Sequence, residues 1–298
     1  MLLSIGCTFF LIINSARADS IFVADYFAGT IERLGLDGTG VTFGTANSPG
    51  TFGLACDSLG NLYVGTIGGP IEKFDSNGNK SVFTSALNDA GDLAVDSSGN
   101  LYAINDGNVN VGIQVFSPSG TPLRSIVVGD SNHNPRGLAV DAAGNIFVGI
   151  NQSGTNSIEK ITPSGTVSVF ASLVTPAQGL AFDSSGNLYA TTGSSIYKYT
   201  QAGVRSIFVS NGLNSPQGLA FDGTGNLYVV VGGNQIEKFT SANVGSAFAS
   251  VSNAVDIAVA LSLPPATDTP TLPQWALICL AAALLIVAGR SASTARSL

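Results

Sequence analysis

The sequence predicts an all-β protein, a six-bladed β-propeller of four-stranded antiparallel blades, and three observations lead to this fold class. A short apolar strand that begins with Ile recurs six times, starting at residues 31, 71, 113, 158, 196 and 236. These starts lie 38 to 45 residues apart, a period typical of propeller blades and solenoids. Only 10% of the 298 residues are charged and 36 are glycine, which favours short strands joined by tight turns. The third observation, an unequal number of strands at the two ends, favours a closed ring.

Each repeat is expected to form a four-stranded meander, and its first turn is the most regular feature. In five repeats an apolar first strand ends in Asp-x-x-Gly-Asn, which leads into a second strand. The five turns begin at Asp57, Asp96, Asp141, Asp183 and Asp222. In such a turn the Asp side chain accepts backbone N–H groups and Gly supplies a positive φ, so catalysis is not needed to explain these residues. A calcium loop is the alternative, but one carboxylate per turn provides too few oxygen ligands.

The repeated Ile opens the third strand, and a short segment with an aromatic or aliphatic residue forms the fourth. The fourth strands are predicted around residues 41–43, 82–83, 125–127, 169–170, 207–208 and 247–248. The hairpin between the third and fourth strands uses glycine, except in the sixth repeat, where Asn243 takes its place. Asn is the residue other than Gly best suited to the left-handed conformation, so a positive φ is expected at Asn243.

The number of strands at the two ends distinguishes a ring from an open stack. The first repeat begins at Ser20-Ile21-Phe22-Val23, which matches a second strand, so its first strand is missing. A matching first strand occurs at residues 255–260, after the sixth repeat and with no second strand behind it. A ring can close by pairing this C-terminal strand with the N-terminal blade, which buries two sheet edges that a solenoid would leave open. The propeller is therefore expected to span residues 19–262.

The two ends of the chain are expected to lie outside this fold. Residues 1–18 contain an apolar run followed by Ala16-Arg17-Ala18, which is typical of a signal peptide cleaved before Asp19. A start codon placed too late or a buried first strand are the alternatives. Residues 263–271 form a proline-rich linker, and residues 272–298 are expected to form a sorting signal with a transmembrane helix.

The last segment resembles a known sorting tail. Thr269-Pro270-Thr271-Leu272-Pro273-Gln274-Trp275, an uncharged apolar run and Arg290 together resemble the IPTL-CTERM tail, a relative of the PEP-CTERM tails. The resemblance implies an exosortase-type membrane protease of a Gram-negative bacterium as partner. It also implies anchorage in the membrane by the tail, and then delivery to the outer surface or the extracellular space once the tail is processed. A plain C-terminal membrane anchor is the alternative.

The repeats resemble the NHL-repeat family of six-bladed propellers. Residues 135–148 read PRGLAVDAAGNIFV and residues 216–222 read PQGLAFD, close to the family's Pro-x-Gly-Leu-Ala-x-Asp-x-x-Gly-Asn-Leu-Tyr-Val signature. The likeness runs from about Ser20 to Leu261 and implies a closed six-bladed ring. The family's Ala-Asp-x-x-Asn after the second strand survives only as Ala24-Asp25, so ligands of relatives do not transfer to this chain.

The net charge limits the class of partner, and the cysteine content limits the possible disulfides. The formal net charge is −7, which argues against nucleic acid as a partner because phosphate recognition needs a basic face. Cys56 is the one cysteine between the predicted leader and tail, so no internal disulfide can form and Cys56 is expected to be a small buried residue.

Ligand recognition is expected on the face that carries the irregular loops, where the second strand joins the third and one blade joins the next. Regular turns serve stacking, so variable loops are the better candidates for binding. The longest of them predict a polar patch that suits a protein or glycan ligand. Its residues are Asp106, Asn108, Asn110, Asp130, Asn132, His133, Asn134, Arg136 and Asn151.

A second candidate site lies near the axis. The residue before Leu-Ala or Ile-Ala in each first strand is glycine in four repeats and aspartate at Asp92 and Asp256, with Gln178 and Gln217 in adjoining positions. Six-bladed relatives of the gluconolactonase type hold a divalent metal at the channel mouth, which implies a metal-dependent lactonase or lyase as the alternative function. A hydrolytic metal site needs several fixed ligands and an acid or base, and the chain has one histidine, His133. The sequence therefore favours a binding module without catalytic residues, metal ligands or cofactor.

Overall fold

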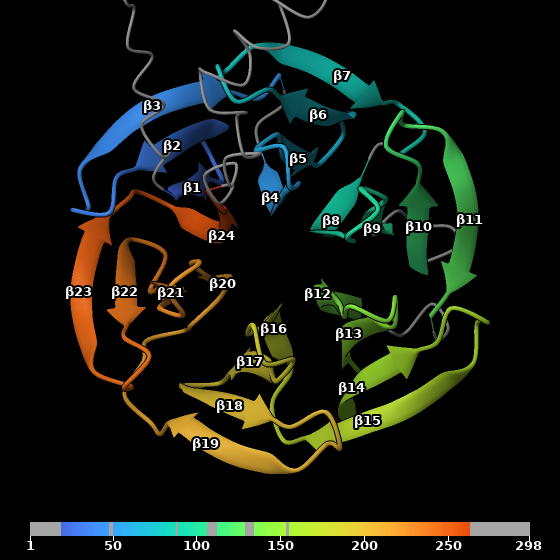
Figure 1. The fold of residues 1–298 in the computed structure, drawn as a ribbon, viewed down its shortest axis with the longest axis vertical. Helices are drawn as coiled ribbons and strands as arrows, with labels where there is room; N and C mark the ends of the chain where they lie inside the picture. The colour runs from blue at the N-terminus through green and yellow to red at the C-terminus, as the bar shows by residue number, and fades with distance from the viewer. Residues whose placement is uncertain are drawn as a thin grey trace, which may run out of the picture. The chain divides into compact units, whose positions relative to one another are not determined.

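Six four-stranded antiparallel sheets are arranged around a central axis in the computed structural model (Figure 1). The structure describes residues 19–47, 50–87, 89–105, 112–128, 134–152 and 155–262. All regular elements in these ranges are β-strands, as the sequence predicts. The first strand of each sheet lies nearest the axis and the fourth lies on the rim (Figure 1). The ring is therefore a propeller, and we number its blades from the N-terminus.

The strands have the following bounds. Blades 1 and 2 consist of β24 (Ala254–Ala260), β1 (Ser20–Asp25), β2 (Thr30–Leu34), β3 (Gly40–Thr45), β4 (Thr51–Cys56), β5 (Leu62–Thr66), β6 (Ile71–Phe74) and β7 (Lys80–Thr84). Blades 3 and 4 consist of β8 (Ala90–Val95), β9 (Leu101–Asn105), β10 (Gly112–Phe116), β11 (Pro122–Val127), β12 (Asn134–Val140), β13 (Ile146–Asn151), β14 (Asn156–Ile161) and β15 (Val167–Leu173). Blades 5 and 6 consist of β16 (Ala177–Phe182), β17 (Leu188–Thr192), β18 (Ser195–Tyr199), β19 (Arg205–Val209), β20 (Leu219–Phe221), β21 (Leu227–Val231), β22 (Gln235–Phe239) and β23 (Gly245–Ser250).

Blade 1 is the predicted composite blade, with the strand order β24-β1-β2-β3. The C-terminal strand β24 pairs antiparallel with β1, and Ala258 lies opposite Phe22 while Ile257 lies opposite Val23. Residues more than two hundred positions apart are thus hydrogen-bonded neighbours. The prediction of circular closure is confirmed, and so is the number of blades.

The Asp-x-x-Gly-Asn turns have the predicted chemistry, with one addition. In the first such turn, Asp57 Oδ1 accepts the N–H groups of Leu59 and Asn61 at 3.0 and 2.9 Å, and Gly60 has a φ of 79°. The strand ends one residue before the Asp, because the Asp backbone already closes the turn. The side chain of Asn61 adds a bond of 2.7 Å from Nδ2 to Asp57 Oδ2, which explains why the motif ends in Asn. The prediction of a positive φ at Asn243 is also confirmed, at 60°.

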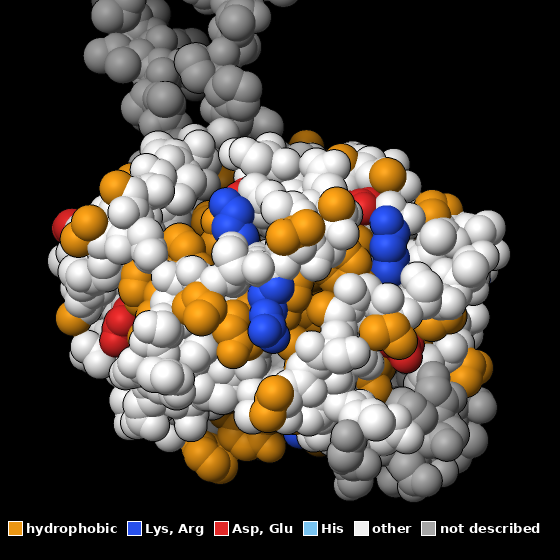
Figure 2. Space-filling model, turned by 90° about the horizontal axis from the view of Figure 1, so that it is seen from below, with side chains coloured by type: hydrophobic (Ala, Val, Ile, Leu, Met, Phe, Trp, Pro, Cys, Tyr) orange, Lys and Arg blue, Asp and Glu red, His pale blue; other side chains and the backbone are white. Residues whose placement is uncertain are grey.

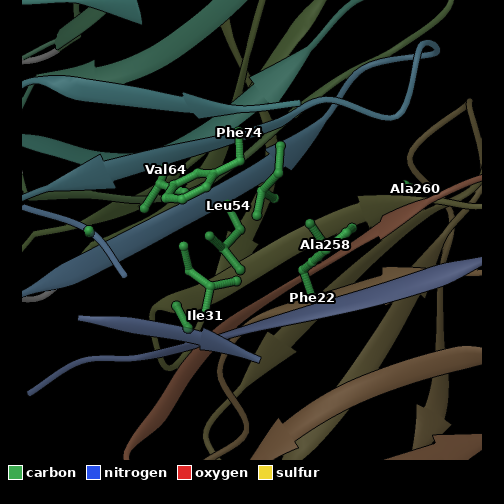
Figure 3. Close-up of a cluster of buried hydrophobic side chains, with 10 residues drawn as sticks. Phe22, Ile31, Leu54, Val64, Phe74, Ala258 and Ala260 are labelled. Atoms are coloured by element: carbon green, nitrogen blue, oxygen red, sulfur yellow. The ribbon is translucent and has the colours of Figure 1, made fainter. Parts of the chain in front are cut away.

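The hydrophobic core consists of layers between neighbouring blades. In the layer between blades 1 and 2, Phe22 and Ala258 face Leu54, Val64 and Phe74 (Figure 3). All five side chains come from strands whose alternate residues point toward the neighbouring sheet, as sheet packing requires. Cys56 packs against this layer, half-buried, and burial raises the pKa of its thiol well above the usual value. It packs against the core, as predicted, but it is partly rather than fully buried.

The rim is formed by the fourth strands, and Figure 2 shows one part of it from the side. Hydrophobic side chains and Lys or Arg side chains lie there as separate small patches within polar surface. In the described part of the chain, no helix is long and apolar enough to cross a membrane. The predicted signal peptide, linker and tail lie outside the described residues.

Candidate functional site

The residues nearest the axis form a ring of six positions, one from each blade. They are Gly53, Asp92, Gly137, Gly179, Gly218 and Asp256. Glycine recurs because each position touches the next blade. A Cβ atom on Gly218 would overlap Asp256 Oδ1 and lie 2.7 Å from Asp256 Cα, and a Cβ atom on Gly179 would lie 2.6 Å from the Gln217 oxygen. At these glycines the neighbouring blades therefore approach one another more closely than a Cβ atom would permit.

The two aspartates in the ring connect neighbouring blades. Asp256 Oδ2 accepts the backbone N–H of Leu54 in blade 2 at 2.7 Å. Asp92 Oδ2 accepts the N–H of Leu138 in blade 4, also at 2.7 Å, while Asp92 Oδ1 accepts the N–H of Leu93 at 2.8 Å. Each carboxylate thus reaches forward to the first strand of the following blade. Bonds between a carboxylate and a backbone N–H are among the stronger hydrogen bonds in proteins, so the pair joins four of the six blades at the axis.

Burial in the narrow channel favours the protonated form of both carboxyl groups. Burial raises the pKa of Asp92 to about 7, although the hydrogen bonds from Leu138 and Leu93 act in the opposite direction. Burial also raises the pKa of Asp256 well above its ordinary value, and the negative charge of Asp92 raises it further. Because the charge of one group shifts the pKa of the other, the two carboxyl groups titrate as a pair, and near neutral pH the pair can hold a proton.

A second layer of side chains surrounds the mouth of the channel, just outside the ring. It consists of the residue that precedes each ring position, namely Phe52, Gly91, Arg136, Gln178, Gln217 and Val255. Together with Asp92, Asp256 and Asn134 they line a cavity of about 70 Å³, to which all six blades contribute. A space of this size holds a few water molecules, whereas pockets that enclose a small-molecule ligand are usually several times larger.

Arg136 and Phe52 define one side of this mouth. The Arg136 guanidinium carbon lies 5.9 Å from the centre of the Phe52 ring, although the two residues belong to blades 4 and 2. Phe52 also packs edge-on against Tyr26, at 5.7 Å between ring centres. The side-chain oxygen of Asn134 is buried and accepts no hydrogen bond from the described residues. The mouth therefore presents a cation, an aromatic ring and amide groups to a ligand.

The structure brings some of the predicted site residues together, and the others lie outside the described residues. Asp92, Arg136, Gln178, Gln217 and Asp256 all line the one cavity, so the two predicted sites meet at Arg136. Asn151 ends β13 and pairs with Asn134, at the same end of blade 4. The predicted residues Asp106, Asn108, Asn110, Asp130, Asn132 and His133 lie outside the described residues.

Phe52 and Val255 belong to the mouth and were not predicted. The available signal was their place in the repeat, because they precede ring residues as Gln178 and Gln217 do. Their apolar character concealed this equivalence. In the part of the chain that the structure describes, no group of three or more His, Cys, Asp or Glu side chains is arranged to hold a metal ion.

Substituting Gly218→Ala should lower the free energy of unfolding by about 2 to 3 kcal/mol, because the new methyl group overlaps Asp256 and neither strand can move without breaking its sheet. Urea denaturation measures this change. The matched control is Gly223→Ala in the same blade, where a Cβ atom would meet side chains alone, Asp19 at 3.2 Å and Leu261 at 3.9 Å. An equal effect of the two substitutions would contradict the close approach at the axis.

Comparisons with known proteins support the fold. No protein-family model matches the sequence, and no curated protein matches it either. Among solved structures, a chain from the crystal structure of a nidogen/laminin complex has a TM-score of 0.72 and 22% identity, and the match covers 83% of this chain and 100% of that one.

Two enzymes are also similar. Virginiamycin B lyase from Staphylococcus aureus has a TM-score of 0.58 and 18% identity, covering 77% of this chain and 80% of that chain. A gluconolactonase from Xanthomonas campestris has the same TM-score and identity, covering 73% of this chain and 84% of that chain. At these identities the likeness establishes the architecture alone. The chain is a six-bladed β-propeller whose structural neighbours include both a component of a protein complex and enzymes.

Proposed function

We propose that this protein is an exported, surface-sorted propeller of the NHL-repeat type that acts as a non-catalytic binding module. Its protein or glycan ligand binds on the face that contains the channel mouth and the irregular loops. Nucleic acid is not among the proposed partners, because the formal net charge is −7.

The observation that carries this proposal is the use made of the acidic residues at the axis. The carboxylates of Asp92 and Asp256 accept backbone N–H groups of the following blades, so their most evident role is to hold the ring together. The groups left to meet a partner are Arg136, Gln178 and Gln217, beside an aromatic ring. Arginine and aromatic residues are over-represented where binding energy is concentrated. The cavity of about 70 Å³ is too small to enclose a substrate, which favours a ligand that lies across the mouth.

The structural neighbours agree with such a role. The nidogen/laminin complex provides a propeller-containing neighbour in an assembly of proteins, and all of the matched chain is covered. The virginiamycin B lyase and gluconolactonase neighbours support the enzyme alternative to the same extent, because they too share only the fold with this chain.

Export and surface sorting rest on the two ends of the sequence. The signal peptide of residues 1–18 would direct export, and the IPTL-like tail of residues 272–298 would hold the protein in the membrane and present it to an exosortase-type protease. Mass spectrometry of protein recovered from the cell surface should find a chain that begins at Asp19 and lacks the apolar tail. A chain recovered with residues 275–289 intact would favour the plain anchor.

A metal-dependent lactonase or lyase is the second candidate, and one observation favours it. The pKa of Asp92 rises to about 7 through burial, so this carboxyl group could exchange a proton at neutral pH beside the Arg136 side chain. A divalent metal would need further ligands than the two described carboxylates.

The binding proposal is tested by substituting Arg136→Ala together with Gln217→Ala. We expect the double variant to bind glycans on an array, or a purified surface protein, at least about tenfold more weakly, since it removes the charged anchor and an amide of the mouth. Arg205→Ala, which removes an arginine on the rim, is the matched control and should bind like the unchanged protein. Equal binding by all three proteins would argue against recognition at the mouth. Divalent-metal-dependent lactone hydrolysis that is lost in Asp92→Asn would favour the enzyme.

A further inference from the structure

A cavity lies between blades 4 and 5 on the face that carries the Asp-x-x-Gly-Asn turns, away from the channel mouth. It has a volume of about 320 Å³. Its walls come from the Asp-x-x-Gly-Asn turn and strands β13, β14 and β15 of blade 4, and from strands β16 and β17 and the two turns of blade 5. The lining includes Asp141, Phe147, Lys160, Phe182, Thr200 and Gln201.

Blade 4 departs from the other repeats at this place. In blades 2, 3 and 6 a tyrosine in the second strand donates its hydroxyl to Oδ2 of the turn Asp. These bonds are Tyr63 to Asp57 at 3.2 Å, Tyr102 to Asp96 at 3.1 Å and Tyr228 to Asp222 at 3.2 Å. Blade 4 has Phe147 at the equivalent position and therefore lacks the hydroxyl. Blade 1 has no such turn, because its first and second strands are the two ends of the propeller.

A lysine of the third strand lies over the second-strand ring in blades 2, 4, 5 and 6. Its Nζ is 5.1 to 5.4 Å from the ring centre in Lys73, Lys160, Lys198 and Lys238. In blade 5 Lys198 Nζ also lies 3.5 Å from Asp183 Oδ2. The acid and the base of blade 5 are thus paired directly. Blade 4 has the same acid and the same base, Asp141 and Lys160, but neither a tyrosine hydroxyl nor a described ion pair between them.

Both charged groups of blade 4 retain bonding capacity, and for Asp141 the reason is the missing hydroxyl. Asp141 Oδ1 accepts the N–H groups of Ala143 and Asn145, but Oδ2 accepts only Asn145 Nδ2, at 2.7 Å. Lys160 Nζ lies 5.4 Å from the centre of the Phe147 ring, and no described carboxylate lies within 4.0 Å of it. Both groups line the cavity. An ammonium and a carboxylate of this kind can together bind one hydroxyl group.

The remaining walls suit a ring with several hydroxyl groups. Phe182 packs edge-on against Phe147 at 5.1 Å and Phe170 does so at 5.0 Å, and both outer rings are half-buried, so they offer apolar surface to a ligand. Across the cavity, the Thr200 hydroxyl and the Gln201 amide are exposed. Thr200 Oγ1 accepts the Val204 N–H and Gln201 Nε2 donates to the Ser185 oxygen, both at 3.2 Å. The Thr200 O–H and the Gln201 side-chain oxygen remain for further hydroxyl groups of a ligand.

We propose that this cavity binds a sugar residue, one hydroxyl of which binds both Asp141 and Lys160 and replaces the hydrogen bond that a tyrosine hydroxyl gives to the turn Asp in blades 2, 3 and 6. The ring of the sugar lies against Phe182, and further hydroxyl groups reach Thr200 and Gln201. The site is independent of the channel mouth, which opens on the opposite face.

Saturation-transfer NMR on the full-length protein tests this proposal with galactose, glucose, mannose and N-acetylglucosamine as ligands and phenol as the single-hydroxyl comparison. We expect transfer to at least one sugar and none to phenol. Substituting Phe147→Tyr restores the pattern of blades 2, 3 and 6, so the variant should be at least as stable as the unchanged protein and bind the sugar at least about tenfold more weakly. Lys160→Met, which retains the apolar stem, should also lose binding.

Tyr63→Phe is the matched control, because it removes a tyrosine hydroxyl at the boundary of blades 2 and 3 and leaves the blade 4 cavity unchanged. Its sugar affinity should stay within about twofold of that of the unchanged protein. The proposal is overturned if none of the sugars shows transfer, if phenol binds and the sugars do not, or if Phe147→Tyr and Lys160→Met bind as well as the control.

Discussion

Truncation of the chain after Asn253 should prevent the propeller from folding into a stable unit. The truncated chain lacks β24, which supplies the innermost strand of blade 1 and pairs with β1 from Ser20 to Asp25. It also lacks Ala258 and Ile257, which belong to the core layers on the two sides of blade 1. Since each blade is held by its two neighbours, removal of one strand exposes a sheet edge and two apolar faces at once. We expect no cooperative thermal transition by circular dichroism.

Truncation after Ser262 is the matched control for this experiment. It keeps β24 and the hydrogen bond of 2.6 Å from the Ser262 N–H to Asp19 Oδ1, and it removes only residues 263–298. This protein should melt cooperatively. If the two truncated chains melted at the same temperature, the C-terminal strand would not be what holds the ring closed.

The stability of the propeller should fall as the pH rises from 5 to 8, which is the second large effect. Burial raises the pKa of Asp92 in the folded protein from 3.8 to about 7, and Asp256 is shifted in the same direction. A carboxyl group with a raised pKa stabilises the fold below its unfolded pKa, and this contribution is lost as the pH rises through the folded pKa. For Asp92 the loss between pH 5 and pH 8 is at most roughly 2 to 3 kcal/mol, since solvent in the channel screens part of it.

Substituting Asp92→Asn should remove most of this pH dependence. The amide oxygen can still accept the Leu138 N–H, but the side chain no longer ionises. The free energy of unfolding, measured in urea at pH 5 and pH 8, should therefore differ less in the variant than in the unchanged protein. Asp75→Asn is the control, because hydrogen bonds, first of all from the Asn79 side chain, hold the pKa of Asp75 below its ordinary value. A drop in stability of the same size in all three proteins would show that other groups cause it.

The aspartates of the turns titrate in a different pH range, so they do not obscure the pH dependence that Asp92 causes. Burial alone would raise the pKa of Asp96 and Asp222, but hydrogen bonds from Asn100 and Asn226 and from the turn backbone hold both below the ordinary value. Their contribution to stability is present above an unfolded pKa of 3.8 and is lost only as the pH falls below it. Stability is therefore expected to be greatest under mildly acidic conditions.

Most of the architecture could be predicted because its determinants are local and repeated. The Asp57 turn and its four equivalents specify where one strand ends and the next begins, whatever the rest of the chain does. The missing first strand at Ser20 and the surplus strand at Asp256 then leave one arrangement that buries both edges. The sequence also identified Asp92, Arg136, Gln178, Gln217 and Asp256 as residues near the axis.

The chemical state and partners of these residues were decided by the tertiary structure. Nothing local indicates that Asp256 accepts the Leu54 N–H across two hundred residues, or that Phe52 and Arg136 meet over the channel. The same holds for the cavity at Asp141 and Lys160, which depends on the spacing between blades 4 and 5. Turn chemistry acts over four or five residues, so the sequence alone determined the blades and their number. Distances between blades depend on how all six sheets pack around one axis, and only the folded ring sets them.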